Sequence, residues 1–394
     1  MIKAELLAPA GDFSCINTAL YFGADAVYLG GPSLQLRSGK VGFTLEDLEK
    51  AVKVIHAKGK KMYVTVNAFA RSGEMEQAGE YAAWLYAAGV DAVIVADLGV
   101  LVAVKKAAPD LPVHISTQAN CTNYVTARTY HDLGASRVVL ARELSLDEIA
   151  EIRAKIPSSL ELEGFVHGAM CMSYSGRCMI SAFMTGRSAN RGECTQPCRW
   201  SYHVMEQTRP GEYFPVVEDE KGTAIFSSHD MCCIGFLDKL EEAGICSFKI
   251  EGRMKSNFYV GSVVDAYRRA MDGTLDIESC RRDLEQVSHR EYCSGFYFGA
   301  FDHKNDGIYH AGSTFIAEVL GWNDGIATLR QRNRFVVGEE LEILSPASHG
   351  LSFTVPEIRN EAGESVPDAP HAMEIVRVPC EHKLSEGDLL RRRA

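Results

Sequence analysis

The chain has 394 residues, of which 46% are hydrophobic and 24% are charged. This composition is typical of a globular protein and excludes a disordered chain, a collagen-like chain and a small disulfide scaffold. Lysine and arginine number 41 against 52 acidic residues, so the net charge is −11. That charge argues against a generic DNA-coating protein, although a local basic groove is compatible with it. The sequence shows neither a long apolar run nor a signal peptide, so we expect a cytoplasmic protein that does not contact a membrane.

The first 170 residues repeat a short apolar run, a turn and an amphipathic stretch. The apolar runs are rich in Val, Ile and Leu, as is typical of parallel strands buried on both faces. The predicted strands are Glu5–Ala8, Ala26–Leu29, Met62–Val66, Ala92–Ala96, Val113–Ser116, Arg137–Leu140, Leu160–Val166 and, after a long gap, Ser247–Ile250. The predicted helices include Leu45–Ala57, Glu76–Ala88, Leu146–Ala154 and Tyr259–Met271.

Eight strands alternating with helices predict an α/β fold, a (β/α)8 TIM-like barrel. A glycine precedes four of the strands, which indicates a helix C-cap followed at once by a strand. No G-x-G-x-x-G motif follows the first strand, which disfavours a doubly wound sheet. The barrel domain is predicted to cover residues 1–309, with a cysteine-rich insertion at 168–243 between its seventh and eighth strands.

From about residue 310 the pattern changes to short β-rich runs separated by turns. The predicted strands are Thr314–Leu320, Gly325–Leu329, Glu340–Ile343, Ser352–Thr354 and Met373–Val378. Residues 310–394 are therefore predicted to form a small C-terminal antiparallel β-barrel domain.

Polar side chains occupy the predicted C-terminal ends of the barrel strands, where the chemistry of such barrels is located. They are Asp12, Arg37, Asn67, Asp97, Gln118, Asn120, Asn123, Arg142, Glu143, His167, Glu251, Arg253 and Lys255. Several of them are expected to cap helices, Asp12 and Asp97 above all. Asn, Gln and Arg at three or more strand ends predict a polar pocket for a ligand with several oxygen atoms.

Four of the 12 cysteines fall within 28 residues of the insertion. They are Cys171, Cys178, Cys194 and Cys198. Four thiolates select zinc or an iron–sulfur cluster. Structural zinc prefers two closely spaced pairs, and only Cys194 and Cys198 form one. We favour a [4Fe–4S] cluster, and zinc or metal-free thiols are the alternatives. One of the adjacent residues Cys232 and Cys233 could replace one of the four ligands.

Several motifs resemble those of the peptidase U32 (collagenase-like protease) family. The main one runs from Glu163 to Ser181 and contains HGAMC and SYSGRC; others are Leu7-Ala-Pro-Ala-Gly11, Ser247–Lys255 and Ser288–Tyr292. The combination of HGAMC, SYSGRC and NRGECTQPCRW is most similar to the tRNA hydroxylation branch of this family. The resemblance covers most of the chain.

The resemblance implies an enzyme that hydroxylates the wobble uridine of tRNA to 5-hydroxyuridine and uses prephenate as a co-substrate. It implies a [4Fe–4S] cluster on the same four cysteines that the spacing singles out. Other members hydroxylate ribosomal RNA or a quinone ring, and these are alternatives. The family name implies a further alternative, a peptidase or other hydrolase. We find neither H-E-x-x-H nor G-x-S-x-G, but His167 and Cys171 are spaced as a candidate thiol dyad.

The two carboxylates of prephenate call for arginine or lysine partners. The candidate substrate-binding residues are Arg37, Asn67, Gln118, Asn120, Arg142, Arg177 and Lys255, and the candidate catalytic residues are His167, Glu251 and Arg253. Glu251 is a candidate base, but we favour an ion pair between it and Lys249 or Arg253.

The insertion also supplies local positive charge. Residues 168–202 contain four arginines and one acidic residue, a net charge of +3. The arginines are Arg177, Arg187, Arg191 and Arg199, and Tyr174, Trp200 and Tyr202 lie among them. Either these residues stack on and bind an anticodon loop, or the arginines offset the charge of the cluster. The predicted partners are therefore tRNA and prephenate, and a homo-oligomer is also compatible with the sequence.

Overall fold

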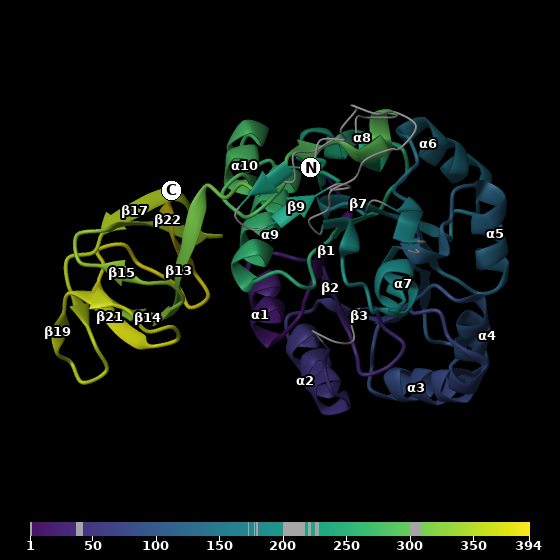
Figure 1. Ribbon diagram of the computed structural model, residues 1–394, viewed down its shortest axis with the longest axis horizontal. Coiled ribbons are helices and arrows are strands. Elements are labelled where there is room, and N and C mark those ends of the chain that lie inside the picture. The colour runs from purple at the N-terminus through teal and green to yellow at the C-terminus, as the bar shows by residue number, and fades with distance from the viewer. Residues whose placement is uncertain are drawn as a thin grey trace.

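Eight parallel strands close into a barrel in the computed structural model (Figure 1). The structure describes residues 2–36, 42–171, 173–176, 178, 180–199, 217–219, 222–224, 228–299 and 309–394. The barrel strands are β1 (Glu5–Pro9), β2 (Ala26–Gly30), β3 (Lys61–Val66), β4 (Ala92–Val95), β5 (Val113–Ile115), β6 (Arg137–Val139), β7 (Glu161–Ala169) and β11 (Ser247–Ile250). Strand β11 pairs with both β1 and β7, which closes the ring.

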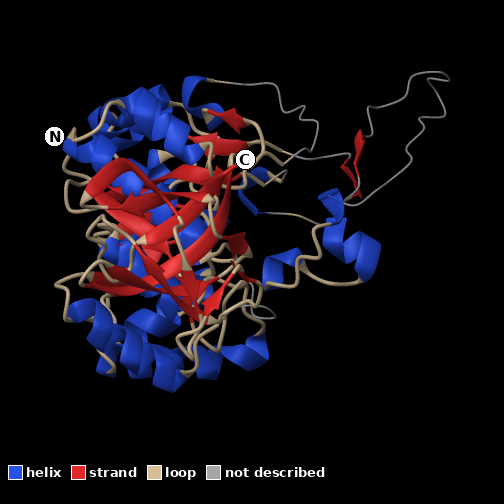
Figure 2. Ribbon diagram, turned by 90° about the vertical axis from the view of Figure 1, so that its left-hand side faces the viewer, coloured by secondary structure: helices blue, strands red, loops and turns tan. Residues whose placement is uncertain are grey.

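Helices surround the barrel, as Figure 2 shows. They are α1 (Phe13–Tyr21), α2 (Leu45–His56), α3 (Met75–Ala87), α4 (Leu98–Ala107), α5 (Tyr124–Asp132), α6 (Leu146–Lys155), α8 (Leu237–Glu242) and α9 (Asn257–Asp272). Side chains cap several N-termini: Asp12 and Asp97 accept the backbone N–H groups of Cys15 and Val100, as expected from the sequence. Gly134, at a φ of 95°, allows the sharp passage from α5 toward β6.

The large apolar core lies between the strands and the helices, where residues such as Leu48, Leu101 and Val138 are fully buried. The inside of the barrel differs, because it also contains buried charged residues, among them Arg137, Glu163 and Lys249. This charged network extends from Arg137, at the N-terminal end of β6, through Glu163 to Lys249, which lines the cavity at the C-terminal ends of the strands.

The insertion begins where β7 ends. Its described elements are η3 (Tyr174–Gly176), α7 (Ile180–Thr185), η4 (Ala189–Arg191), η5 (Pro197–Arg199), β8 (Val217–Asp219), β9 (Gly222–Ala224), β10 (Asp230–Cys232) and η6 (Ile234–Phe236). Strand β10 returns antiparallel to the end of β7, with Asp230 opposite Ala169. The chain therefore leaves and re-enters the barrel at one point, and the insertion lies over the C-terminal ends of the strands.

The chain leaves the barrel through α10 (Ile277–Leu284), β12 (Tyr292–Cys293) and η7 (Gly295–Phe298). The C-terminal strands are β13 (Ser313–Asn323), β14 (Ile326–Gln331), β15 (Phe335–Val336), β16 (Glu340–Ser345), β17 (Ser348–Thr354), β18 (Ile358–Arg359), β19 (Ser365–Val366), β20 (Asp368–Ala369), β21 (Ile375–Pro379) and β22 (Leu389–Arg393). Eight of them form an antiparallel sheet in the order β17-β16-β22-β13-β14-β21-β18-β19.

The predicted fold class is confirmed: a TIM-like barrel, an insertion between its seventh and eighth strands, and a C-terminal antiparallel sheet. The C-terminal sheet contacts the barrel through Arg391, which donates to Asp283 on α10 at 2.8 Å and to Glu342 on β16 at 3.0 Å. The division at residues 309 and 310 stays a prediction. Within the described part of the chain, no helix is both long and apolar enough to cross a membrane.

Candidate functional site

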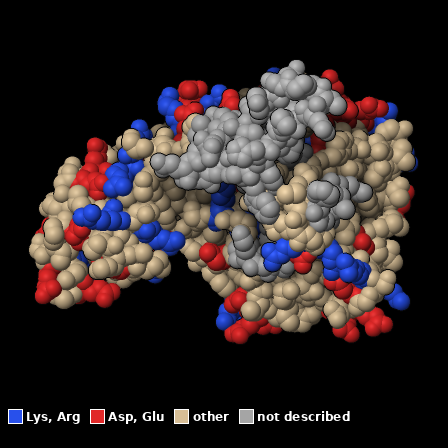
Figure 3. Space-filling model, viewed as in Figure 1, with Lys and Arg blue, Asp and Glu red and all other residues tan. Residues whose placement is uncertain are grey.

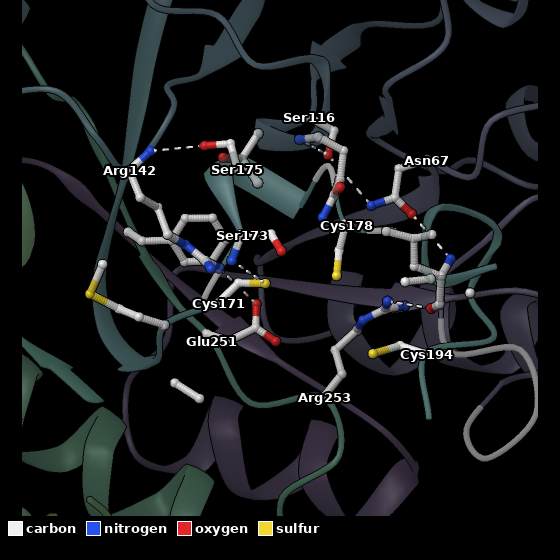
Figure 4. Close-up of a pocket in the computed structure, with 18 of the residues that line it drawn as sticks. Asn67, Ser116, Arg142, Cys171, Ser173, Ser175, Cys178, Cys194, Glu251 and Arg253 are labelled. Carbon is white, nitrogen blue, oxygen red and sulfur yellow. Dashed lines mark hydrogen bonds and ion pairs between the residues drawn. The ribbon is translucent and has the colours of Figure 1, made fainter. Parts of the chain in front are cut away.

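A cavity of about 200 Å³ lies at the C-terminal ends of the barrel strands, beneath the insertion (Figure 4). The predicted site residues that line it are Asn67, Gln118, Arg142, Cys171, Cys178, Cys194, Cys198, Glu251 and Arg253. Asn120, His167 and Lys255 do not line it. The predicted contacts Arg37, Arg177, Trp200 and Tyr202 lie outside the described residues.

All four clustered cysteines border this cavity. Figure 4 shows the sulfur atoms of Cys171, Cys178 and Cys194 pointing toward the same open space. The Sγ of Cys171 accepts the backbone N–H of Ser173 at 3.4 Å. Cys171 and Cys194 are exposed, and Cys178 and Cys198 are partly exposed, so the thiols are accessible to a ligand.

The donor set consists of four thiols, and thiolates are ligands of both zinc and iron–sulfur clusters. Among the described residues, no three His, Cys, Asp or Glu side chains are grouped closely enough to hold one metal ion. A cluster distributes its ligands over several metal atoms, so its thiolates stand further apart than those of one zinc ion. Four thiols around one cavity therefore fit an iron–sulfur cluster in number and in chemistry.

Arg142 and Glu251 form a polar part of the cavity wall, and Figure 4 shows their contact drawn near Cys171. The Arg142 guanidinium lies 4.0 Å above the ring of Phe165, and one of its nitrogens is 3.5 Å from a Glu251 carboxylate oxygen. The sequence analysis expected Glu251 to pair with Lys249 or Arg253, and that expectation is wrong about the partner. Arg142 comes from the loop after β6, and the parallel pairing of β6 and β11 with the strand between them, β7, brings this loop close to the end of β11.

Arg253 lines the cavity but is already held by the protein. Its guanidinium donates to Gln35 at 2.9 Å, to Thr65 at 3.0 Å and to the Leu36 carbonyl at 2.6 Å. These contacts fix the loop after β2 against the end of β3. Arg253 thus shapes the wall of the cavity, and its candidate catalytic role stays a prediction.

Lys249 is a cavity residue that the sequence analysis did not select. Its ammonium donates to Glu163 at 2.7 Å and lies 4.4 Å from the centre of the Tyr28 ring. Arg137 donates to the other Glu163 oxygen at 3.0 Å. Burial alone would raise the pKa of Glu163, but the charges of Lys249 and Arg137 outweigh it and lower the pKa to about 2.

Arg290 and Asp230 were also missed. Arg290 is 1% exposed, lines the cavity, pairs with Asp230 at 2.7 Å and donates to the His229 carbonyl at 3.2 Å. This pair holds the end of the insertion against the segment before β12. Arg290 stands within the Ser288–Tyr292 motif, and this motif could have indicated a site residue. It was missed because candidate site residues were sought only at the ends of barrel strands, and this motif does not follow one.

His167 points into an aromatic cluster rather than into the cavity. Its ring packs against Tyr259, Tyr267 and Tyr292, and its Nδ1 is 3.4 Å from the Tyr267 hydroxyl. Burial lowers the pKa of His167 to about 3, so the ring is neutral at physiological pH. No hydrogen bond within the described residues joins this ring to Cys171, which leaves the predicted thiol dyad without its geometry.

Two further predicted residues lie beside the cavity. The Lys255 ammonium donates to the Ser288 carbonyl at 3.3 Å and lies 5.0 Å from the centre of the Tyr259 ring. Asn120 has a φ of 60° at the end of η2 (Thr117–Ala119), and its buried side-chain oxygen has no partner among the described residues. Neither residue contributes to the lining.

The arginines of the insertion have different environments. Arg191 is engaged by Glu74 at 2.9 Å, whereas Arg187 is exposed. Tyr174 is 53% exposed. On the described part of the face in Figure 3, basic side chains alternate with acidic ones rather than forming one basic surface.

Comparison with known proteins assigns the chain to a family. Residues 11–306 match the sequence model of peptidase family U32, and residues 312–391 match the model of the U32 C-terminal domain. The chain belongs to peptidase family U32.

Three U32 relatives have informative names. The chain is 36% identical to tRNA hydroxylation protein P of Escherichia coli (strain K12), over 94% of this chain and 92% of the relative. It is 36% identical to tRNA hydroxylation protein P1 of Bacillus subtilis (strain 168), over 99% and 95%. It is 38% identical to the 23S rRNA 5-hydroxycytidine C2501 synthase of Escherichia coli (strain K12), over 79% of this chain and 45% of that relative.

Proposed function

We propose that this U32 protein is an RNA-hydroxylating enzyme that converts the wobble uridine of tRNA to 5-hydroxyuridine, with a [4Fe–4S] cluster as cofactor and prephenate as co-substrate. The observation that carries the proposal is the convergence of four cysteines on the cavity that the strand-end polar residues also line. The full-length relatives named tRNA hydroxylation proteins support tRNA as the substrate.

The ligands of the cluster would be Cys171, Cys178, Cys194 and Cys198. A bound cluster supplies one-electron chemistry, which protein side chains alone do not provide. The protein contributes the surroundings: the Ser173 N–H directed at Cys171 and the cationic wall formed by Arg142 and Arg253. Hydrogen bonds and positive charge near thiolates stabilise their ionised form.

Prephenate would bind in the part of the cavity that Arg142 lines. Arg142 offers a guanidinium that is 14% exposed and is held at a fixed height by the Phe165 ring. Its Glu251 contact, at 3.5 Å, is long, so a ligand carboxylate that approaches bidentately can replace it. Asn67 and Gln118 supply amide groups for the remaining oxygens of prephenate or for the edge of the uracil base.

The uridine would enter past the insertion, where exposed Tyr174 and Arg187 offer a stacking face and a phosphate contact. An unpaired base in an anticodon loop can be turned out toward such a face, as single-stranded RNA recognition requires. Burial lowers the pKa of His167 to about 3, so this imidazole would be too weak a base to activate a thiol there.

The test is nucleoside analysis of cells that lack this gene. Digested tRNA should lose 5-hydroxyuridine and regain it when the wild-type gene is restored, but not when Cys171→Ser is restored. Blocking prephenate synthesis should give the same loss. Ribosomal RNA from the same cells shows whether 5-hydroxycytidine is the product instead. Unchanged tRNA nucleosides in the deletion strain would refute the proposed substrate.

A further inference from the structure

Two carboxylates that do not line the cavity tie the cysteine-rich insertion to the rim of the barrel. Glu143 lies on the loop after β6, and Glu74 ends η1 (Ser72–Glu74) after β3. Each accepts hydrogen bonds from a segment of the insertion that is distant in sequence, by 32 residues for Glu143 and by 117 for Glu74. Glu143 contacts the turn after Cys171, whereas Glu74 contacts the segment before Cys194.

Glu143 holds the turn that follows Cys171. The backbone N–H of Ser175 donates to one carboxylate oxygen at 2.6 Å, and the Ser175 hydroxyl donates to the other at 2.5 Å. The same hydroxyl oxygen accepts the backbone N–H of Arg142 at 3.3 Å. Ser175 is 2% exposed and has a φ of 36°, a left-handed conformation that a serine adopts only when its surroundings impose it.

Glu74 holds the segment that precedes Cys194. The Arg191 guanidinium donates to its two oxygens at 2.9 and 3.1 Å and also to the Phe69 carbonyl at 2.7 Å. These hydrogen bonds lower the pKa of Glu74 and keep it ionised. Cys194 follows Arg191 by three residues, and the next residue, Thr195, donates its N–H to Ser181 on α7 at 3.1 Å.

We propose that Glu143 and Glu74 are positioning residues that place two halves of the metal-binding cysteine set independently, Glu143 the turn beginning at Cys171 and Glu74 the segment containing Cys194. Neither carboxylate lines the cavity, so each acts through the backbone that it holds. A site assembled from loops must be ordered before its ligands can meet one centre, and fixing the backbone in advance reduces that entropic cost. The inference rests on the proposed function for the identity of the group that the thiols bind. The two anchoring roles rest on the hydrogen bonds alone.

Glu148 provides the matched comparison for Glu143. It lies five residues further along the same loop and helix, and it also accepts a backbone N–H and a hydroxyl, both from Ser145. These bonds form the capping box of α6 and do not reach the insertion. Removal of Glu148 therefore tests the loss of a similar carboxylate without the loss of an anchor.

The test is the rate at which iodoacetamide alkylates each cysteine of the metal-free, reduced full-length protein, followed by peptide mass spectrometry. Glu143→Ala should change the Cys171 rate several-fold relative to exposed Cys246 and leave the Cys194 rate unchanged. Cys171 is exposed already, so its rate reports the conformation of the turn that Glu143 holds. Glu74→Ala should change the Cys194 rate and leave the Cys171 rate unchanged. Glu143→Gln, which keeps one acceptor, should give an intermediate rate, and Glu148→Ala should change neither.

Two outcomes overturn the inference: equal alkylation rates in all variants, or a change at both Cys171 and Cys194 from either single substitution. Anaerobic reconstitution with ferrous iron and sulfide is measured on the same proteins. Pair-selective alkylation without any iron uptake in the wild type would retain the two anchors and refute the cluster. Full iron uptake with unchanged alkylation rates would support the cluster and refute the two anchors. Circular dichroism confirms that each variant is folded.

Discussion

Lys249 on β11 and Glu163 on β7 form an ion pair of 2.7 Å inside the barrel, and Lys249 is part of the cavity wall. Their side chains are 5% and 0% exposed. Water therefore cannot replace either partner, and each charge is balanced by the other and by Arg137.

Lys249→Met should destabilise the protein by about 3–5 kcal/mol, because it leaves the Glu163 carboxylate buried with one partner fewer. Lys155→Met is the control: Lys155 pairs with Glu151 at the surface, where both side chains are about half exposed, and its loss should cost less than about 1 kcal/mol. Urea unfolding measures both values. Equal losses of unfolding free energy in the two variants would show that the buried ion pair contributes no more to stability than the surface pair.

Acid should remove the contribution of this network. The pKa of Glu163 is lowered from 4.5 to about 2, and that of Glu342, which Arg391 and Arg393 contact, is lowered likewise. A carboxylate with a depressed folded-state pKa contributes stability that is present above about pH 4.5 and is lost as the pH falls toward 2. The difference in unfolding free energy between wild type and Glu163→Gln should therefore shrink between pH 5 and pH 3. A constant difference over this interval would contradict the assigned pKa.

Gly168 is expected to tolerate no side chain. Its φ is 105°, and an added Cβ would lie 2.5 Å from the Glu251 carbonyl oxygen. Gly168→Ala should therefore cost at least about 2 kcal/mol more than Gly59→Ala, where φ is 67° and nothing lies within 4 Å, so that only about 1 kcal/mol of backbone strain arises. Thermal unfolding compares the two. Similar midpoints would mean that β7 and the Glu251 loop separate easily.

Local sequence patterns predicted the barrel strands well. Each strand is marked by an apolar run, and the glycine that ends the preceding helix lies only a few residues before several of these runs. Strand β7 extends three residues beyond its predicted end, to Ala169, because β10 pairs with it there. The partner of Glu251 depends on the pairing of β6, β7 and β11, and the setting of His167 depends on packing against α9. Both contacts join residues at least 100 positions apart. Single-sequence reasoning had no access to those contacts.

Charged residues inside strands were the main omission from the predicted site. Glu163 and Lys249 were treated as strand residues although they stand in recognised motifs, and their pairing requires the register that sets Lys249 opposite Phe165. The four cysteines, predicted as metal ligands from their clustering in sequence, all line the cavity. Their function as ligands stays a prediction.

Arg142→Lys should reduce hydroxylation by weakening co-substrate binding. Lysine cannot form the two parallel hydrogen bonds to a carboxylate, and it loses the stacked position over Phe165. We expect kcat/KM for prephenate to fall about 10- to 100-fold, mostly through KM, with unfolding stability little changed. Arg128→Lys, at an exposed position on α5, is the control. An unaltered KM would exclude Arg142 from prephenate binding.

The most direct measurement is the iron and acid-labile sulfide content of the anaerobically purified protein, with its visible absorption, in the wild type and in single Cys→Ser variants. The account predicts about four irons and four sulfides per wild-type chain. It predicts a marked loss in Cys171→Ser, Cys178→Ser, Cys194→Ser and Cys198→Ser, and no loss in Cys246→Ser, which lies outside the cavity. Colourless wild-type protein without iron that still restores 5-hydroxyuridine to tRNA would contradict it.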